Sequence, residues 1–261
     1  MNRRGFALVA VLWVLTALTA LTGVALTVAR TGGQTTRNRV LLARSGLARE
    51  ACVEILLARY AQDPTVRRVN TVDLGRGTWC RAVVEEPAAK LNVNIAERDV
   101  LERLLSAVSH QLSAVDSILA FRRRGPIYNL AQVRGVDSAL AVRLAPFVTT
   151  RGTGVVNVNA ATREVLAVLP GMTEEAIQVA LLHREARPLR SADELGALLS
   201  RSSRTLLYTA YPEFTRTAVF TPPQLVAVVE GGVQGTALMS RATLTLVPAP
   251  GRLAVIRRET E

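Results

Sequence analysis

The stretch FALVAVLWVLTALTALTGVALTVA, residues 6–29, contains no charged side chain. As an α-helix it would be roughly 36 Å long, enough for the roughly 30 Å hydrocarbon core of a bilayer. Arg3 and Arg4 precede it, and basic residues favour the cytoplasmic side. We therefore expect a transmembrane helix at 6–29 with the remaining chain on the other side. The alternative is a secretory signal peptide, whose apolar core usually has about 7–15 residues.

The composition indicates a folded chain but does not assign a function. The chain has 261 residues, of which 49% are hydrophobic, and a net charge of +11 that comes almost wholly from arginine. Because the arginines are scattered, nucleic acid, an acidic surface and coding bias all remain open. The two cysteines, Cys52 and Cys80, lack the spacing of a zinc or redox motif, so a buried apolar pair and a single bridge are both open.

The segments after the apolar run predict a helix followed by a sheet. From Val40 onward, apolar residues recur at three- and four-residue steps with arginines on other faces, which indicates that the helix continues in amphipathic form. Gly32 and Gly33 are expected to weaken or kink it. From residue 213, short β-rich runs alternate with proline and glycine turns, which is typical of an antiparallel sheet. Residues 78–84 are a candidate first strand.

Two segments between the helix and these strands repeat one another. LNVNIAERDVLERL at 91–104 matches VNVNAATREVLAVL at 156–169 in register. The repeat extends to 119–133 and 181–195, where each copy reads as helix, basic turn, proline and helix. We expect Asn94 and Asn159 to cap and brace the helices that follow them. The pattern predicts a duplicated all-α module at 91–212.

The N-terminus resembles that of a type IV pilin or pseudopilin precursor, because a short basic leader ends in Gly5 and Phe6 opens the apolar helix. The resemblance implies that prepilin peptidase removes the leader 1–5 and that the new terminal Phe6 is N-methylated. Most members carry Glu at the fifth mature position, where it pairs with a neighbour's terminal amine. Here that position is Ala10, which suits a subunit at the filament tip, where no such pairing is needed.

The whole order of segments resembles the general secretion pathway protein K family, the large minor pseudopilins of type II secretion. The resemblance rests on the Gly5-Phe6 junction, Ala10, and the KLNVN and VVNVNAATREVLAVLPGM segments. It implies an α+β pilin-like fold in which a helical module, 91–212, is inserted between 30–90 and the C-terminal strands of 213–261. In this layout Cys80 lies near the helix face that carries Cys52, so a disulfide is predicted.

The same resemblance implies where the protein acts and with what partners. It places the chain in the inner membrane, with a cytoplasmic N-terminus and a periplasmic bulk, and later at the tip of a periplasmic pseudopilus. The expected partners are other minor pseudopilins, prepilin peptidase, the inner-membrane assembly platform, and the secretin or the secreted substrate. The implied role is to start pseudopilus assembly and support export across the outer membrane.

A membrane-anchored DNA-binding protein of DNA uptake is the alternative. VRGVDSALAVRL at 133–144 and LPGMTEEAIQVALL at 169–182 resemble helix-hairpin-helix hairpins, in which a second glycine brings backbone amides close to phosphate. Asp137 and Thr173 occupy that position here, and Glu174 and Glu175 follow Thr173. Carboxylates repel phosphate, so the sequence argues against nucleic-acid binding.

The sequence offers no catalytic constellation. His110 and His183 are its only histidines, and neither belongs to a zinc motif or stands beside a nucleophile. We expect a non-enzymatic protein without a cofactor. Calcium bound by loop carboxylates is left open, because no EF-hand spacing identifies its ligands.

Overall fold

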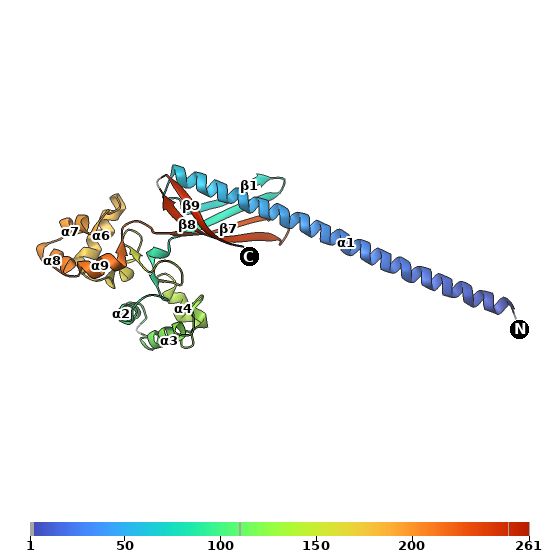
Figure 1. Cartoon of the computed structure of the whole chain (residues 1–261), viewed down its shortest axis with the longest axis horizontal. Helices are drawn as coiled ribbons and strands as arrows, with labels where there is room; N and C mark the ends of the chain where they lie inside the picture. Colours follow the sequence, from blue (N-terminus) through green and yellow to red (C-terminus); the bar gives the residue numbers. More distant parts are fainter. Residues whose placement is uncertain (1–2, 110, 250, 261) are drawn as a thin grey trace.

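The computed structural model describes residues 3–109, 111–249 and 251–260. A long helix, an antiparallel sheet and a helical module follow one another along the molecule (Figure 1). Helix α1, Arg3–Gln62, continues without a break through Gly32 and Gly33, where the sequence favoured a kink. Its first half projects away from the rest of the chain, and its second half lies on the sheet (Figure 1).

The sheet has five strands in the order β1-β2-β7-β8-β9, and every neighbouring pair is antiparallel. The strands are β1 Arg68–Gly75, β2 Thr78–Glu85, β7 Leu225–Val233, β8 Met239–Ala249 and β9 Arg252–Thr260. The strand expected at 78–84 is β2, and β1 before it was not expected. The helical module is therefore inserted between two strands, β2 and β7, that are neighbours in the sheet.

One face of the sheet packs against the second half of α1. Cys52, Val53 and Leu56 of the helix are almost fully buried against alternate residues of the strands, such as Ala82 and Ala227. Alternation along a strand places the intervening residues on the opposite face. The apolar spacing after Val40 thus correctly identified an amphipathic helix, and burial of its apolar stripe against the sheet stabilises the pilin-like part.

The inserted module consists of two copies around one core. The first comprises η1 Pro87–Ala89, β3 Leu91–Asn92, α2 Arg98–Val108, α3 Ser113–Arg122, η2 Leu130–Gln132, α4 Ser138–Leu144 and β4 Val148–Thr149. The second comprises β5 Val156–Asn157, α5 Arg163–Ala167, α6 Glu174–Ala186, α7 Ala192–Leu198, α8 Arg201–Thr209, α9 Tyr211–Thr217 and β6 Ala218–Val219. The short parallel pairs β3·β4 and β5·β6 bring together the two ends of their copies, so the module is mainly rather than wholly helical.

The module ends later than the sequence boundary at 212 suggested. Helix α9 crosses that boundary, and its Phe214 is fully buried in the module core. The β-like run at 217–220 does contain a strand, β6, but this strand pairs with β5 and not with the sheet. Strand propensity indicated the conformation correctly, whereas the pairing partner depends on the tertiary fold.

Candidate functional site

The first half of α1 exposes apolar side chains over its whole circumference. From Val11 to Val28 its large apolar residues are 54–73% exposed. Within the described residues, α1 is the helix long and apolar enough to cross a membrane. The hydroxyls of Thr16, Thr19 and Thr27 donate to carbonyls one turn earlier, which satisfies them in apolar surroundings. This segment requires either lipid or apolar partner helices around it.

The predicted processing site lies at the start of this helix. The backbone of Gly5, Phe6 and Ala10 is helical, so a cut after Gly5 would leave an N-terminus that continues directly into α1. The side chains of these three residues lie outside the described part of the structure. Cleavage, methylation and the consequence of the missing carboxylate at Ala10 therefore stay predictions.

The second half of α1 packs closely on a glycine of β7, Gly231. A Cβ atom added at Gly231 would lie 2.3 Å from the backbone nitrogen of Arg49 and 2.5 Å from the carbonyl oxygen of Ser45. Only a residue without a side chain permits this approach of helix to strand, so Gly231 fixes how closely α1 packs on the sheet. Gly232 pairs with Trp79 of β2, and its added Cβ would lie 2.6 Å from the Trp79 ring on the opposite face of the sheet.

Polar contacts hold the same junction in register. The buried hydroxyl of Ser45 donates to the Leu41 carbonyl, 2.9 Å away, as in an ordinary helix, and lies 3.3 Å from the Leu238 carbonyl. Arg49 donates to the Ser240 hydroxyl at 2.8 Å and to the carboxylate of Glu50 at 2.6 Å. The hydrogen bond from Arg49 is the main cause that lowers the pKa of the Glu50 carboxyl. These bonds tie α1 to β8 and the turn before it.

Cys52 of α1 and Cys80 of β2 lie in contact at the centre of this interface, as the pilin layout implied. Both are fully buried, and both are free thiols rather than the predicted disulfide. Burial, followed by the hydrogen bond with Cys80, raises the pKa of the Cys52 thiol far above its usual value. The pair packs as two small apolar side chains, which is the other interpretation that the sequence left open.

The two repeat asparagines do not cap helices, which corrects the sequence prediction. Helix α2 begins after Glu97 and α5 after Thr162, three residues beyond Asn94 and Asn159. The Asn94 side-chain amide instead donates to the carbonyls of Ile127 and Thr150, and its oxygen accepts from the Ile127 amide.

Asn159 makes the same three bonds in the second copy, to both backbone groups of Leu189 and to the carbonyl of Phe220. Each asparagine thus joins three segments of its copy: the strand that opens the copy, the residue after a proline (Pro126 or Pro188), and the chain that closes the copy. The bracing half of the prediction is confirmed. Capping fails because each side chain points across the module, away from the helix that follows.

An arginine in each copy also has a structural role that the sequence reasoning missed. Arg122 donates to the carbonyls of Val93 and Ala96, at 3.3 and 2.7 Å. Arg184 makes the equivalent bonds to Val158 and Ala161, at 3.1 and 2.7 Å. The repeat alignment pairs these two arginines, so their equivalence was a visible signal, but basic turns are usually solvated and gave no reason to single them out.

The two hairpins that suggested DNA binding use their helix N-termini internally. Asp137 caps α4 by accepting from the Leu140 amide at 2.6 Å, and Thr173 caps α6 by accepting from Ala176 at 3.1 Å. A phosphate would need these amides as donors, and an Asp carboxylate stands beside them in the first hairpin. The geometry gives no support to nucleic-acid binding at either hairpin.

In the part of the chain that the structure describes, no group of three or more His, Cys, Asp or Glu side chains could hold a metal ion. His183 receives a hydrogen bond from Arg187 at 3.2 Å and lies 3.6 Å from the Glu194 carboxylate. His110 lies outside the described residues.

Helix α1, the antiparallel sheet on which it packs and the module inserted between two neighbouring strands define an α+β fold of the pilin-like class. No protein-family model matches the sequence, and no curated protein sequence matches it. Among solved structures, the chain resembles a chain of the GspK–GspI–GspJ complex from the type 2 secretion system of enterotoxigenic Escherichia coli. The match has a TM-score of 0.55 at 14% identity and covers 89% of this chain and 99% of the other. The expected fold is therefore confirmed.

Proposed function

We propose that this protein is a minor pseudopilin of a type II secretion pseudopilus. The observation that carries the proposal is the order of its parts: an exposed apolar helix, two strands, a duplicated module and three closing strands. A chain of the GspK–GspI–GspJ complex has a similar fold, and the similarity covers 89% of the present chain and 99% of that chain. Such a helix is soluble only when lipid or other apolar helices surround it, as in a membrane and then a filament core.

Two independent features support a position at the tip of the pseudopilus. Ala10 removes the carboxylate that, by family resemblance, would pair with the terminal amine of a neighbouring subunit. The module lies beyond the sheet, at the end of the molecule opposite the projecting half of α1 (Figure 1). If α1 points toward the filament core and the membrane, the module occupies the space in which a further subunit would stack.

The proposed role is to start assembly with other minor pseudopilins and so to support export across the outer membrane. The N-terminus would be cytoplasmic until prepilin peptidase cuts after Gly5, and the sheet and module would be periplasmic. The inner-membrane assembly platform would then move the helix from lipid into the filament. The secretin or the secreted substrate would meet the exposed module.

Co-purification from membranes that also contain the I- and J-type minor pseudopilins tests this role. We expect a complex that survives detergent extraction. The variant Ala10→Glu should reduce complex formation and pseudopilus assembly, because a carboxylate without a partner amine would be buried in an apolar core. Ala10→Leu, which keeps the position apolar, is the matched control. Full assembly by Ala10→Glu would count against the tip position, and absence of any complex would count against the role itself.

A further inference from the structure

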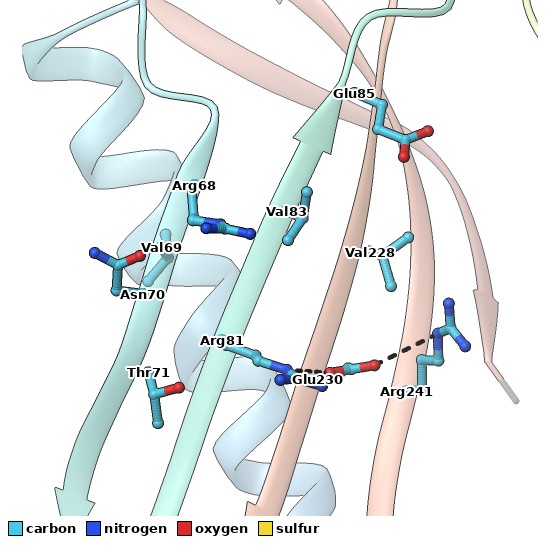
Figure 2. Close-up of a pocket in the computed structure, with 10 residues that line it drawn as sticks. All are labelled: Arg68, Val69, Asn70, Thr71, Arg81, Val83, Glu85, Val228, Glu230 and Arg241. Carbon is cyan, nitrogen blue, oxygen red and sulfur yellow. Dashed lines mark hydrogen bonds and ion pairs between the residues drawn. The ribbon is translucent and has the colours of Figure 1, made fainter. Parts of the chain in front are cut away.

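The sheet carries a hollow on the face opposite α1. It has a volume of about 490 Å³ and opens between strands β1, β2, β7 and β8 (Figure 2). Its lining residues are Arg68, Val69, Asn70, Thr71, Arg81, Val83, Glu85, Val228, Glu230 and Arg241. Because the residues of β2 that face α1 alternate with Arg81 and Val83, these two side chains point away from the helix. The hollow is thus separate from the helix–sheet interface.

A β-bulge in the edge strand forms one wall of the hollow. Val69 pairs with Ala82 and Val72 pairs with Cys80, so the two residues Asn70 and Thr71 stand opposite Arg81 alone. The extra residue interrupts the ladder and bends the strand. Bulges at sheet edges often mark binding or catalytic sites.

The floor and rim of the hollow differ in chemistry. Val83 pairs with Val228 across β2 and β7, and Val83 remains 38% exposed, so the floor is apolar and open. Arg68 pairs with Val83 on the other side, and its guanidinium extends toward that valine (Figure 2). An apolar floor beside a basic rim suits a ligand that carries both an apolar and an acidic group.

The charges of the hollow leave a positive excess. Arg81 of β2 and Arg241 of β8 both form ion pairs with the one carboxylate of Glu230 between them (Figure 2). Glu85 lies at the far end of β2. Arg68 is exposed, and its guanidinium has no hydrogen-bond or ion-pair partner within residues 3–109, 111–249 and 251–260. Of the three guanidinium groups, the one on Arg68 is therefore available for a further carboxylate.

We propose that this hollow binds an acidic, extended segment of a partner protein. A carboxylate of the segment pairs with Arg68, and an apolar side chain next to it packs on Val83 and Val228. An extended segment is favoured over a helix because the hollow follows the bulged edge of a sheet, where side chains alternate. The site does not depend on the filament role, since it lies on the face of the sheet that α1 leaves uncovered.

Fluorescence anisotropy with the full chain in uncharged detergent micelles tests the proposal. The probe is a short fluorescent peptide of alternating glutamate and valine. We expect saturable binding that weakens as salt is added, and Arg68→Gln should lower the affinity by about tenfold or more, the loss typical of one charge-assisted hydrogen bond. Arg252→Gln, at the opposite edge of the same sheet, removes the same charge and should leave the affinity unchanged.

Two further variants separate the charged and apolar parts of the site. Arg68→Glu should abolish binding, and thermal unfolding should match that of the unmodified chain because Arg68 has no internal partner to lose. Val83→Ser should weaken binding of the peptide of glutamate and valine more than that of a peptide of glutamate and serine.

Three results would overturn the proposal. The first is no saturable binding of the peptide. The second is equal loss of affinity in Arg68→Gln and Arg252→Gln, which would indicate general attraction to a basic protein. The third is displacement of the peptide by inorganic phosphate as effectively as by unlabelled peptide, which would indicate a simple anion site instead of a peptide site.

Discussion

Replacing Gly231 with alanine should push α1 away from the sheet. The new Cβ would lie 2.3 Å from the Arg49 nitrogen, 2.5 Å from the Ser45 carbonyl oxygen and 2.8 Å from the Ala48 carbonyl carbon, whereas ordinary contact begins at 3.4 Å. The helix would have to retreat by about 1 Å, because backbone atoms on a helix cannot rotate aside as a side chain does. Overpacking of a core costs about 1–3 kcal/mol, and we expect a loss near or above about 3 kcal/mol here.

Such a loss is large enough to measure by thermal unfolding. For a protein of roughly 150–250 residues, 1 kcal/mol corresponds to about 2–4 °C, so about 3 kcal/mol predicts a decrease of roughly 6–12 °C in Tm for the full chain. Circular dichroism of the full chain in detergent micelles follows the transition. The retreat should also weaken the Arg49 hydrogen bond to Ser240, because that bond spans the same junction.

Gly46→Ala is the matched control for this experiment. Gly46 lies in the same helix, and a Cβ there would meet nothing within 4 Å. Alanine favours a helix over glycine by about 1 kcal/mol, so Tm should rise. If Gly231→Ala unfolds at the same temperature as the unmodified chain, the close packing of α1 on β7 that underlies the fold would be refuted.

Three more predictions concern the module and the buried thiols. Asn94→Ala and Asn159→Ala should each lower the free energy of unfolding, measured in urea, by about 1–3 kcal/mol, because buried backbone groups lose their hydrogen-bond partners. Asp at either position should not restore the stability. An unchanged free energy of unfolding in both variants would contradict the bracing role. Cys52 should resist iodoacetamide at neutral pH until the protein unfolds, because burial raises the pKa of its thiol; alkylation in the native state would contradict this. The pKa of the Glu175 carboxyl is lowered mainly by the hydrogen bond from the Ser200 hydroxyl. This hydrogen bond therefore stabilises the fold above about pH 4.3, the pKa of Glu in an unfolded chain. The stabilisation is lost as the pH falls through the lower pKa of Glu175 in the folded protein. Unfolding midpoints of the unmodified chain and Glu175→Gln should therefore converge at low pH, and a difference that is constant with pH would contradict the assignment.

The sequence predicted those parts of the fold that depend on periodicity over many residues. The apolar run at 6–29 and the amphipathic stretch after Val40 both describe α1, and the register of the repeat predicted two equivalent copies that the structure shows. The helix continues through Gly32 and Gly33, where a weak point or kink was expected, because glycine lowers helix stability without forcing an end.

The residues of the module show where local patterns reach their limit. Asn94 and Asn159 stand before helices, as caps do, but a cap must lie directly at the helix start, and each asparagine lies three residues too early. Their actual partners, such as Ile127 and Leu189, are about 30 positions away, so only the tertiary fold brings them together. The repeat still indicated that whatever one asparagine does, the other does too.

The boundaries depended on pairing, which single segments do not specify. Residues 217–220 have strand character, yet β6 joins the module because Phe214 before it is buried in the module core. Strand β1 was missed because its bulge at Asn70 and Thr71 interrupts the alternation that identifies a strand. The same bulge forms the hollow on the outer face, so the irregularity that hid the strand also marks the proposed binding site.

The N-terminal residue of the mature protein, isolated from membranes of cells that contain prepilin peptidase, tests the pseudopilin proposal most directly. Mass spectrometry of the intact chain and its N-terminal peptide gives this residue and its modification. The proposal predicts a chain that begins at N-methylated Phe6 and keeps the whole apolar segment. A chain that begins near residue 30 would show that the segment is a signal peptide, and the filament role would be contradicted.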